Sequence, residues 1–221
     1  MAEKLVIGGF ASTKKQIQTV AIKLSEHFDV DVEGLNFREA LGKPRAFFDD
    51  QSLITHSGGM LPVAHSQPYD LIAVAPPAPE RISKLLWRGW LMGRKLGQAE
   101  AAVTKFRDTS QFEALRYPQT HFGRLPEISQ FNALEAAYHL GKRGVETTIV
   151  LMQNDGIFRY DHSVVHDEPS RPYRLISLEG EHVDFTNHPA EILGSMSVAS
   201  QVRFKRKCEK LYSSQGHLVA A

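Results

Sequence analysis

Residues 52–59 read SLITHSGG, a short apolar run that ends in a turn of small residues. The run from Ser52 to Thr55 is typical of a short buried strand, and a helix is expected from the two glycines onward until the break before Pro68. Ser57 stands between the two, where a sharp strand-to-helix turn lifts a side chain above the edge of a sheet. This stretch therefore predicts a strand, a tight turn and a helix around a serine.

Apolar runs alternate with amphipathic segments on both sides of this stretch, which is the pattern of repeated strand-helix units. A strand over Lys4–Ile7 meets Gly8-Gly9, and Ser12 is placed to cap the helix that follows. Residues 70–75, DLIAVA, are nearly all apolar, as expected of a strand covered on both faces. The remaining strand candidates are residues 30–35, 147–152 and 173–178, and helices are expected at 132–141 and 190–212. The pattern predicts a single α/β domain over residues 1–221, a three-layer sandwich with a mostly parallel sheet of about six strands.

Two further residues follow strand candidates and supply what a nucleophilic serine needs. Asp155 comes just after the run TTIVLM, where its carboxylate can accept the Nδ1 proton of a histidine and hold its tautomer. His182 follows the last strand candidate, where its Nε2 can take the serine proton. Ser57, Asp155 and His182 thus stand at strand ends in the order serine, acid, histidine, and we expect them to form a catalytic triad.

Plainer interpretations of these residues stay open. Ser57 and Asp155 also suit ordinary turns, because Ser-Gly-Gly and Asn-Asp-Gly are strong turn signals. Asp161 and Asp184 are weaker alternatives for the acid, and His188 is the rival for the histidine. The combination of all three residue types in this order favours the triad over any single motif.

These motifs resemble the α/β-hydrolase superfamily. The resemblance rests on the serine turn after a strand, on Asp-Gly-Ile-Phe after the penultimate strand, and on Gly-x-His after the last strand. Pro189 then lies seven residues beyond His182, at the start of the final helix. The likeness covers most of the chain. It implies an esterase-, lipase- or thioesterase-like serine hydrolase that acts on a small acyl ester or related carbonyl substrate without a cofactor.

The resemblance also implies an oxyanion hole made by the backbone N–H groups of Phe10 and Gly58. The chain departs from the family pattern at three points. Thr55 replaces the first glycine of G-x-S-x-G, Gly8 occupies the place of the usual histidine, and the sheet begins at what is the third strand of the family. His56, beside the nucleophile, is expected to shape the turn and not to act as a base.

Residues 79–130 are expected to form a helical lid inserted into the domain. The strand at 70–75 ends in Pro-Pro-Ala-Pro, so the chain must leave the sheet there. A helical pattern runs over residues 80–97 and is followed by a polar, irregular stretch. Trp87 and Trp90 are candidates for an apolar acyl pocket beneath this lid, although a stripe of this kind is more often plain core packing.

The composition favours a small molecule as the partner. The chain carries 26 basic and 25 acidic residues, so nothing points to a nucleic acid or an anionic membrane. The single cysteine, Cys208, cannot form an internal disulfide, and neither a signal peptide nor a membrane-spanning segment is evident, which predicts a cytoplasmic protein. The His and carboxylate residues at 161–168 lack a recognised ligand spacing, so no metal site is expected.

Two other classes of protein stay open. A non-catalytic binding or scaffold protein of the same fold is consistent with Thr55, Gly8 and the shortened sheet. A nucleotide-binding α/β protein rests on Gly8-Gly9, but neither G-x-G-x-x-G nor a Walker lysine follows. The sequence does not separate a hydrolase from an acyltransferase or a lyase with the same triad, and it sets neither the acyl length nor the oligomeric state.

Overall fold

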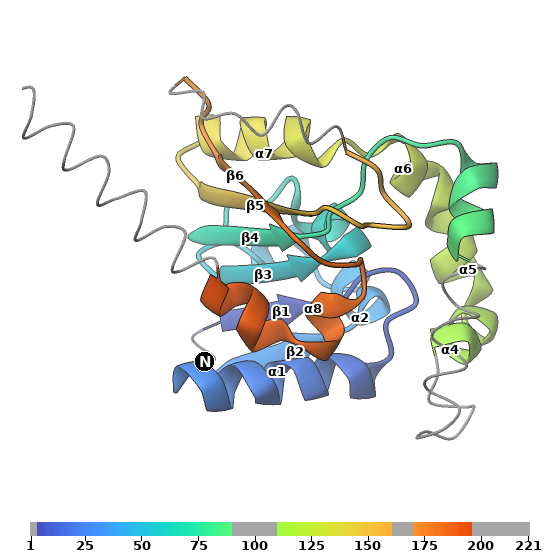
Figure 1. Ribbon diagram of the computed structural model, residues 1–221, viewed down its shortest axis with the longest axis horizontal. Coiled ribbons are helices and arrows are strands. Elements are labelled where there is room, and N and C mark those ends of the chain that lie inside the picture. The colour runs from blue at the N-terminus through green and yellow to red at the C-terminus, as the bar shows by residue number, and fades with distance from the viewer. Residues whose placement is uncertain (1–3, 90–109, 161–169, 196–221) are drawn as a thin grey trace, which may run out of the picture.

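The computed structural model describes residues 4–89, 110–160 and 170–195, which form an α/β fold around a parallel sheet (Figure 1). The strands lie in the order β2-β1-β3-β4-β5-β6, and each neighbouring pair is parallel. They are β1 (Lys4–Ile7), β2 (Val32–Leu35), β3 (Ser52–His56), β4 (Asp70–Val74), β5 (Glu146–Met152) and β6 (Arg174–Leu178). The predicted parallel sheet is confirmed, and each predicted strand matches the observed one to within two residues at either end.

Helices cover both faces of the sheet, so the predicted three layers are confirmed (Figure 1). One face carries α1 (Lys14–Phe28), α8 (Asp184–Asn187) and the helical residues 189–195. The other face carries α7 (Ala133–Lys142), together with α2 (Phe37–Leu41) and the short 3-10 helix η1 (Arg45–Phe47). The part of the final helix that the sequence predicts beyond residue 195 lies outside the described residues.

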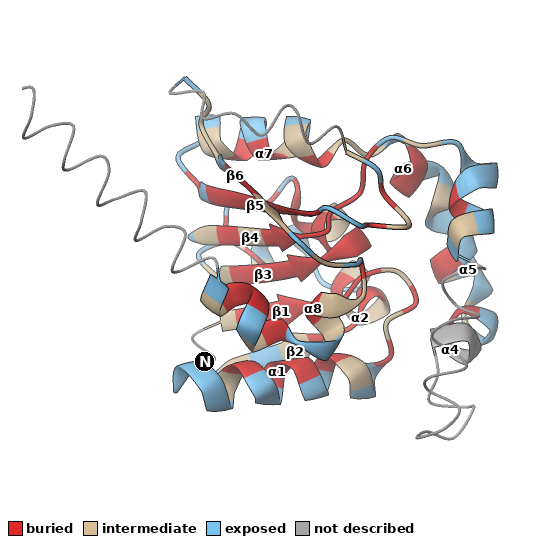
Figure 2. Ribbon diagram, in the orientation of Figure 1, coloured by how far each residue is buried: buried red, intermediate tan, exposed pale blue. Residues whose placement is uncertain are grey.

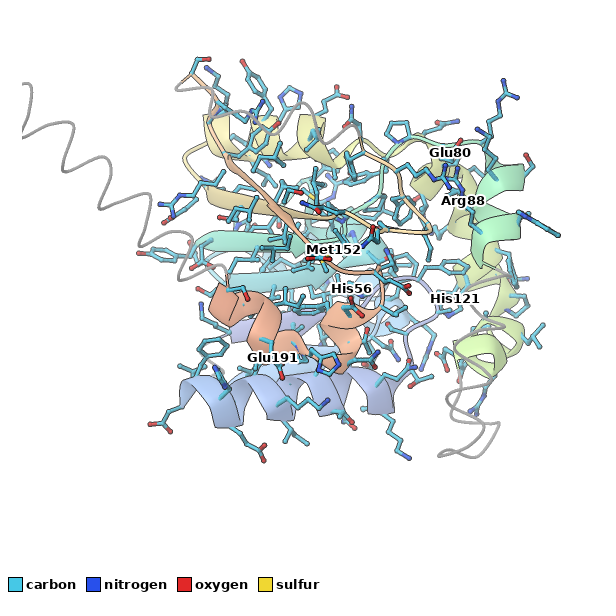
Figure 3. All side chains as sticks on the ribbon, in the orientation of Figure 1. His56, Glu80, Arg88, His121, Met152 and Glu191 are labelled. Carbon is cyan, nitrogen blue, oxygen red and sulfur yellow. The ribbon has the colours of Figure 1, made fainter. Side chains whose placement is uncertain are left out.

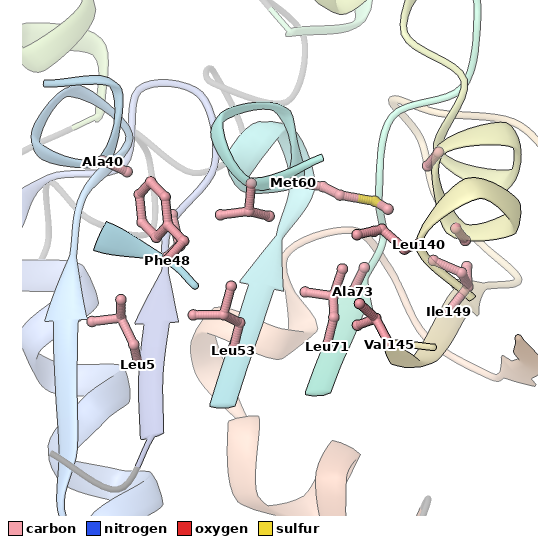
Figure 4. Packing of buried hydrophobic residues seen from close by; sticks show 14 of the residues in the cluster. Leu5, Ala40, Phe48, Leu53, Met60, Leu71, Ala73, Leu140, Val145 and Ile149 are labelled. Carbon is pink, nitrogen blue, oxygen red and sulfur yellow. The ribbon is translucent and has the colours of Figure 1, made fainter. Parts of the chain in front are cut away.

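The core consists of two apolar layers, one on each face of the sheet. Because side chains alternate along a strand, Leu5 and Leu53 pack with Leu140 of α7, whereas Val6 packs with Leu24 of α1 on the opposite face. Figure 4 shows the first of these layers at close range, and Figure 2 shows that burial is concentrated in the strands. Strands buried on both faces read as continuous apolar runs, which is why the sequence predicts them so well.

The N-terminus of α1 differs from the prediction by one residue. Thr13, and not Ser12, caps the helix: its side-chain oxygen accepts from the Gln16 N–H at 3.1 Å, and Gln16 Oε1 accepts from the Thr13 N–H at 2.9 Å. The two contacts form a capping box. Ser12 instead accepts the N–H of Phe37 at 3.4 Å and joins the loop after β1 to the start of α2.

The helix predicted after the two glycines is shorter and tighter than expected. A 3-10 helix, η2 (Ser57–Val63), follows β3 directly and contains Pro62. Proline has no N–H group for an i→i−4 hydrogen bond, so an α-helix is not favoured here. The prediction of a helix continuing to Pro68 is therefore wrong, although the strand-to-helix turn itself is present.

The described parts of the segment between β4 and α7 lie beyond the carboxyl ends of the strands (Figure 1). Its described helices are residues 82–89, α4 (Ser110–Arg116), α5 (Pro118–His121), the 3-10 helix η4 (Phe122–Arg124) and α6 (Leu125–Gln130). We call residues 79–130 the insertion. No described helix is both long and apolar enough to cross a bilayer, and the cytoplasmic location stays a prediction.

The buried side chain of Thr55 generates a stability prediction. Its Oγ1 is buried and has no hydrogen-bond partner in the part of the chain that the structure describes, whereas Thr147 Oγ1 donates to the Val145 carbonyl at 3.2 Å. Thr55→Val removes an unsatisfied hydroxyl, so we expect the free energy of unfolding to rise by about 1 kcal/mol, or roughly 2–4 °C in Tm. Thr147→Val, the matched control, is expected to lower it by about the same amount. Thermal unfolding of both variants checks this, and shifts of equal sign would contradict it.

Candidate active site

Ser57 lies at the turn between β3 and η2 with a backbone conformation that side-chain-bearing residues rarely adopt. Its φ is 53°, in the left-handed region, and the residue is 7% exposed. Such a conformation costs on the order of 1–3 kcal/mol and persists only where the surrounding structure enforces it. A strained serine on a sharp strand-to-helix turn is the geometry of a nucleophile elbow.

The loop after β1 packs directly against this turn. A Cβ at Gly59 would lie 2.6 Å from the Ile7 carbonyl oxygen, and a Cβ at Gly9 would lie 2.9 Å from both Ser57 Oγ and the His56 carbonyl oxygen. Both positions therefore require glycine. The close approach fixes the elbow against the neighbouring strand, even though Thr55 replaces the first glycine of the family pattern.

Gly8, the second departure from that pattern, also has a steric explanation. A Cβ at this position would overlap the side chains of Ser12 and Ile17. The usual histidine therefore has no room here. The loop takes its shape from the helix packed beneath it and not from a side chain at position 8.

Two backbone N–H groups lie close together beside Ser57. A Cβ built on Gly58 would be 3.4 Å from the Phe10 nitrogen, so the two residues predicted to form the oxyanion hole are neighbours. Neither N–H has an acceptor among the described residues, and no side chain caps the start of η2. Gly58 lies in the first turn of η2, where N–H groups have no intrahelical partner. The oxyanion hole expected at Phe10 and Gly58 stays a prediction.

Asp155 and His182 form a buried, hydrogen-bonded pair. His182 Nδ1 donates to Asp155 Oδ2 at 2.8 Å, and the two side chains are only 5% and 4% exposed. The other carboxylate oxygen accepts the N–H groups of Ile157 at 2.7 Å and Phe158 at 2.9 Å. With its proton on Nδ1, His182 presents Nε2 as an acceptor, which is the form that a general base needs.

The surroundings keep the Asp155 carboxyl ionised. Burial raises its pKa, but the charge of His182 and its hydrogen bond, with the N–H groups of Phe158 and Ile157, lower it by more. The net pKa of Asp155 therefore lies below the ordinary value for aspartate. An ionised carboxylate is suited to stabilise an imidazolium on His182 during proton transfer.

His56, at the end of β3, ties the histidine loop to the elbow. Its Nε2 donates to the His182 carbonyl oxygen at 2.8 Å, and its ring centroid lies 4.9 Å from that of His182 and 5.4 Å from that of Phe185. Burial and the nearby His182 lower the pKa of His56 to about 3, so it stays neutral. A neutral ring with its Nε2 already engaged positions His182 and is not a base.

The described residues contain no hydrogen bond between Ser57 Oγ and His182 Nε2. The structure thus joins the acid to the histidine directly, and it joins the serine to them through His56, its neighbour in the chain. Catalytic hydrogen bonds are often loose without substrate, so this geometry is compatible with a triad.

The alternative residues have other roles or lie elsewhere. Asp184 Oδ2 accepts the Glu181 N–H at 2.6 Å, within the loop that carries the histidine. His188 is exposed and pairs with Glu191 at 3.7 Å. Asp161 and the cluster at 161–168 lie outside the described residues, and the described ones include no group of three or more residues able to hold a metal ion.

The insertion touches the loops on both sides of the site, which sequence patterns did not indicate. Arg88 Nη1 donates to Glu80 Oε2 at 2.9 Å and to the Ile157 carbonyl at 3.0 Å, in the loop that carries Asp155. His121 Nδ1 accepts the Ala11 N–H at 3.3 Å, in the loop after β1. Figure 3 shows Glu80, Arg88 and His121 together on the side of the molecule beyond the carboxyl ends of the strands.

An apolar cluster fills the space between the insertion and the elbow. Its buried members are Phe37, Ala78, Leu85, Ile128 and Phe158. Trp87 is 61% exposed on the helical residues 82–89, and Trp90 lies outside the described residues. The acyl pocket that we expected at these two tryptophans stays a prediction.

No protein-family model and no curated protein matches the sequence. Solved structures match the fold over most of the chain. An esterase from Exiguobacterium antarcticum aligns over 91% of this chain and 93% of its own, at 13% identity and a TM-score of 0.56. A structure from work on carboxylesterases of Nitrososphaera gargenis aligns over 93% and 92%, at 13% identity and a TM-score of 0.54. An N-formylmaleamic acid deformylase from Pseudomonas putida aligns over 87% and 91%, also at 13% and 0.54.

The contact at Gly9 predicts a steric effect on the elbow. A Cβ there would overlap the Ser57 side chain, whereas a Cβ at Gly123 would meet no atom within 4 Å. We expect Gly9→Ala to lower the free energy of unfolding by about 1–3 kcal/mol and Gly123→Ala to leave it nearly unchanged. Chemical denaturation measures both. Equal stabilities of the two variants would show that the loop after β1 moves to accommodate a Cβ at position 9 without loss of stability.

The low pKa of Asp155 predicts a pH dependence of stability. A carboxyl group with a lowered folded-state pKa stabilises the fold above its unfolded pKa, about 3.9, and this contribution is lost as the pH falls through the folded value. Asp155→Asn keeps an oxygen for the two N–H groups but carries no charge. We expect wild type to exceed this variant by about 1–3 kcal/mol at neutral pH, with the difference shrinking below about pH 4. Denaturant titrations across this pH range measure it, and a constant difference would contradict it.

Proposed function

The chain has the α/β-hydrolase fold, and on that premise we propose that it is a serine hydrolase that cleaves a small acyl ester or a related carbonyl substrate. Ser57 is the nucleophile, His182 the base and Asp155 the acid of the triad. One observation carries the proposal: a buried Asp155–His182 pair, 2.8 Å apart, lies at the same sheet edge as a serine strained to φ 53°. Strain and buried charge together are characteristic of catalytic sites.

The proposed first step is the attack of Ser57 Oγ on the carbonyl carbon. His182 Nε2 takes the Oγ proton as the new C–O bond forms, and the carbonyl electron pair moves onto the oxygen. The Phe10 and Gly58 N–H groups donate to this oxyanion. When the tetrahedral intermediate collapses, the bond to the leaving alcohol breaks and His182 returns the proton to it.

Water completes the cycle. His182 Nε2 takes a proton from a water molecule as that water attacks the acyl-enzyme, and the same two N–H groups bind the second oxyanion. When the second intermediate collapses, the bond between the acyl carbon and Ser57 Oγ breaks, His182 returns the proton to Oγ, and the carboxylic acid leaves. The steps use only side chains and backbone of this chain, and Asp155 stays ionised throughout to stabilise the protonated histidine.

The surroundings of the site favour an apolar acyl group. We propose that the insertion, residues 79–130, is a lid, since it lies over the carboxyl ends of the strands and its Leu85 and Ile128 join the apolar cluster beside the elbow. Phe10 and Phe158 border the same space. Trp87 and Trp90 remain candidates for the outer part of this pocket. The esterases with the same fold are consistent with an ester substrate.

A non-catalytic binding protein of the same fold is the second candidate. The specific observation in its favour is that no hydrogen bond links Ser57 Oγ with His182 Nε2. In that case Ser57 is not activated, because its proton has no acceptor at the moment of attack. Reactivity of the serine therefore separates the two candidates.

Labelling by a fluorophosphonate probe tests the proposal. We expect the purified protein to label covalently, and Ser57→Ala and His182→Ala to lose more than about 99% of the labelling rate, because triad members act as a unit. Ser66→Ala is the matched control: Ser66 is also buried near η2, but its Oγ donates to the Val63 carbonyl at 2.7 Å. Its variant should label like wild type.

Hydrolysis of a series of short and medium p-nitrophenyl esters then defines the acyl preference. A folded wild-type protein that neither labels nor hydrolyses any of them would refute the triad as chemistry and support the binding protein. Labelling that survives Ser57→Ala would place the nucleophile elsewhere.

A further inference from the structure

His121 is a buried histidine that the proposed triad does not use. It ends α5 in the insertion, is 0% exposed, and packs against the rings of both Phe10 and Phe37, with centroid distances of 5.2 Å and 6.0 Å. Its Nδ1 accepts the Ala11 N–H at 3.3 Å across 110 residues of sequence. This hydrogen bond links the insertion to the loop that follows β1.

The second nitrogen of His121 shows that packing alone does not explain the residue. Since Nδ1 accepts a hydrogen bond, the ring proton is on Nε2, and Nε2 is buried without a partner among the described residues. An unsatisfied buried donor destabilises a protein. An apolar ring at position 121, packed against Phe10 and Phe37, would carry no such donor. What histidine offers here and an apolar ring lacks is the acceptor at Nδ1.

The backbone that this acceptor holds is strained. Ala11 has a φ of 59°, in the region that disfavours residues with a Cβ, and the Ser12 N–H closes a turn back to the Gly9 carbonyl at 3.1 Å. The Ala11 N–H belongs to the peptide plane directly after Phe10. Fixing that plane, while the His121 ring packs edge-on against the Phe10 ring, restrains Phe10 from two sides.

We propose that His121 is a positioning residue for the oxyanion hole: by accepting the Ala11 N–H it holds the loop so that the Phe10 N–H faces an oxygen bound at Ser57. The inference rests on the proposed function. Oxyanion donors act in the transition state and must be in place before it forms. A loop that does not hold its donor in place therefore lowers kcat even when substrate still binds.

The charge state of His121 agrees with this role. Burial, and then the positive charge of Arg38, lower the pKa of His121 to about 4, which leaves Nδ1 unprotonated near neutral pH. Arg38 itself is held in α2 by Glu113, 3.7 Å away in α4, and lies over the Tyr117 ring at 4.2 Å. Nδ1 of His121 is therefore an acceptor near neutral pH.

Three substitutions separate positioning from packing. His121→Phe keeps an aromatic ring and removes both the acceptor and the unsatisfied Nε2–H. His121→Asn places its Oδ1 where Nδ1 stood, so the acceptor is retained, whereas His121→Gln carries its oxygen one bond farther from the backbone. His139→Phe is the control, because His139 is an exposed residue of α7 that takes no part in the site.

The measurements are kcat and KM with the best p-nitrophenyl ester, the rate of fluorophosphonate labelling, Tm, and hydrogen exchange at the Ala11 amide. We expect His121→Phe to lower kcat and the labelling rate at least about tenfold, short of the roughly 10²–10³ of deleting a donor outright, with KM unchanged. Its Tm should equal or exceed that of wild type, and the Ala11 amide should exchange faster. His121→Asn should recover kcat to within about threefold of wild type, and His139→Phe should match it.

Different results would refute the role of His121 and the proposed hydrolase function. Equal kcat for wild type and His121→Phe, or equal losses in the Asn and Phe variants, would overturn the inference. If His121→Phe does not fold, kcat is compared between His121→Asn and His121→Gln. Equal kcat values of these two variants would overturn the inference. A wild type that neither labels nor turns over refutes the proposed function instead, and unchanged exchange at Ala11 in the variants would then overturn the loop restraint as well.

Discussion

The contact between two backbones, the loop after β1 and the turn at Ser57, is the constraint on which the site depends. β1 and β3 are adjacent and parallel, so the segments that leave them meet at one edge of the sheet. With glycine at positions 9 and 59 the two segments approach so closely that a Cβ at either position would overlap an atom of the other segment. That proximity holds Ser57 at a φ it would not adopt alone, and it places the Phe10 and Gly58 N–H groups beside the serine side chain. The strain at Ser57 and the closeness of Phe10 to Gly58 therefore have a common cause.

The other half of the site is organised by hydrogen bonds and not by contact alone. Asp155 is held by two backbone N–H groups of its own loop, and His182 is held by Asp155 on one side and, through its carbonyl, by His56 on the other. His56 belongs to β3, so the loop after β6 is anchored to the strand that carries the serine. Burial and the nearby His182 lower the pKa of His56 and keep it neutral. Asp155 stays charged because the charge and hydrogen bond of His182 and two backbone N–H groups lower its pKa by more than burial raises it.

Much of this arrangement follows from local sequence. The four central strands β1, β3, β4 and β5 are largely buried apolar runs, so their positions can be predicted. The residues after strands β3, β5 and β6 must gather at one edge of a parallel sheet. Residue type alone does not predict the cap where two adjacent residues are both suitable. Ser12 and Thr13 are both good caps, and the backbone conformation determines which of them caps the helix. Pro62 signals a break, but the sequence does not say that a 3-10 helix replaces the α-helix.

The contacts between the insertion and the loops around the site left no signal in the sequence. His121 meets Ala11 across 110 residues, and Arg88 meets Ile157 across 69. No spacing, motif or propensity connects the two residues of either pair. Each contact depends on how the insertion packs against the rest of the domain. The orphaned Thr55 hydroxyl is equally invisible, since whether a threonine finds a partner is decided by the packing around it.

The two anchors of the insertion bear on how a protein of this design diversifies. A covering segment that merely rests on its domain can be replaced as a unit, and new specificities then arise by exchange of that unit. Here Arg88 donates to the loop of Asp155 and His121 accepts from the loop of Phe10, so the segment that borders the apolar space is also hydrogen-bonded to two loops of the candidate site. A substitution in the insertion that breaks one of these hydrogen bonds also affects a loop of the candidate site. The sequences of the insertion and of these loops are therefore expected to change together during evolution.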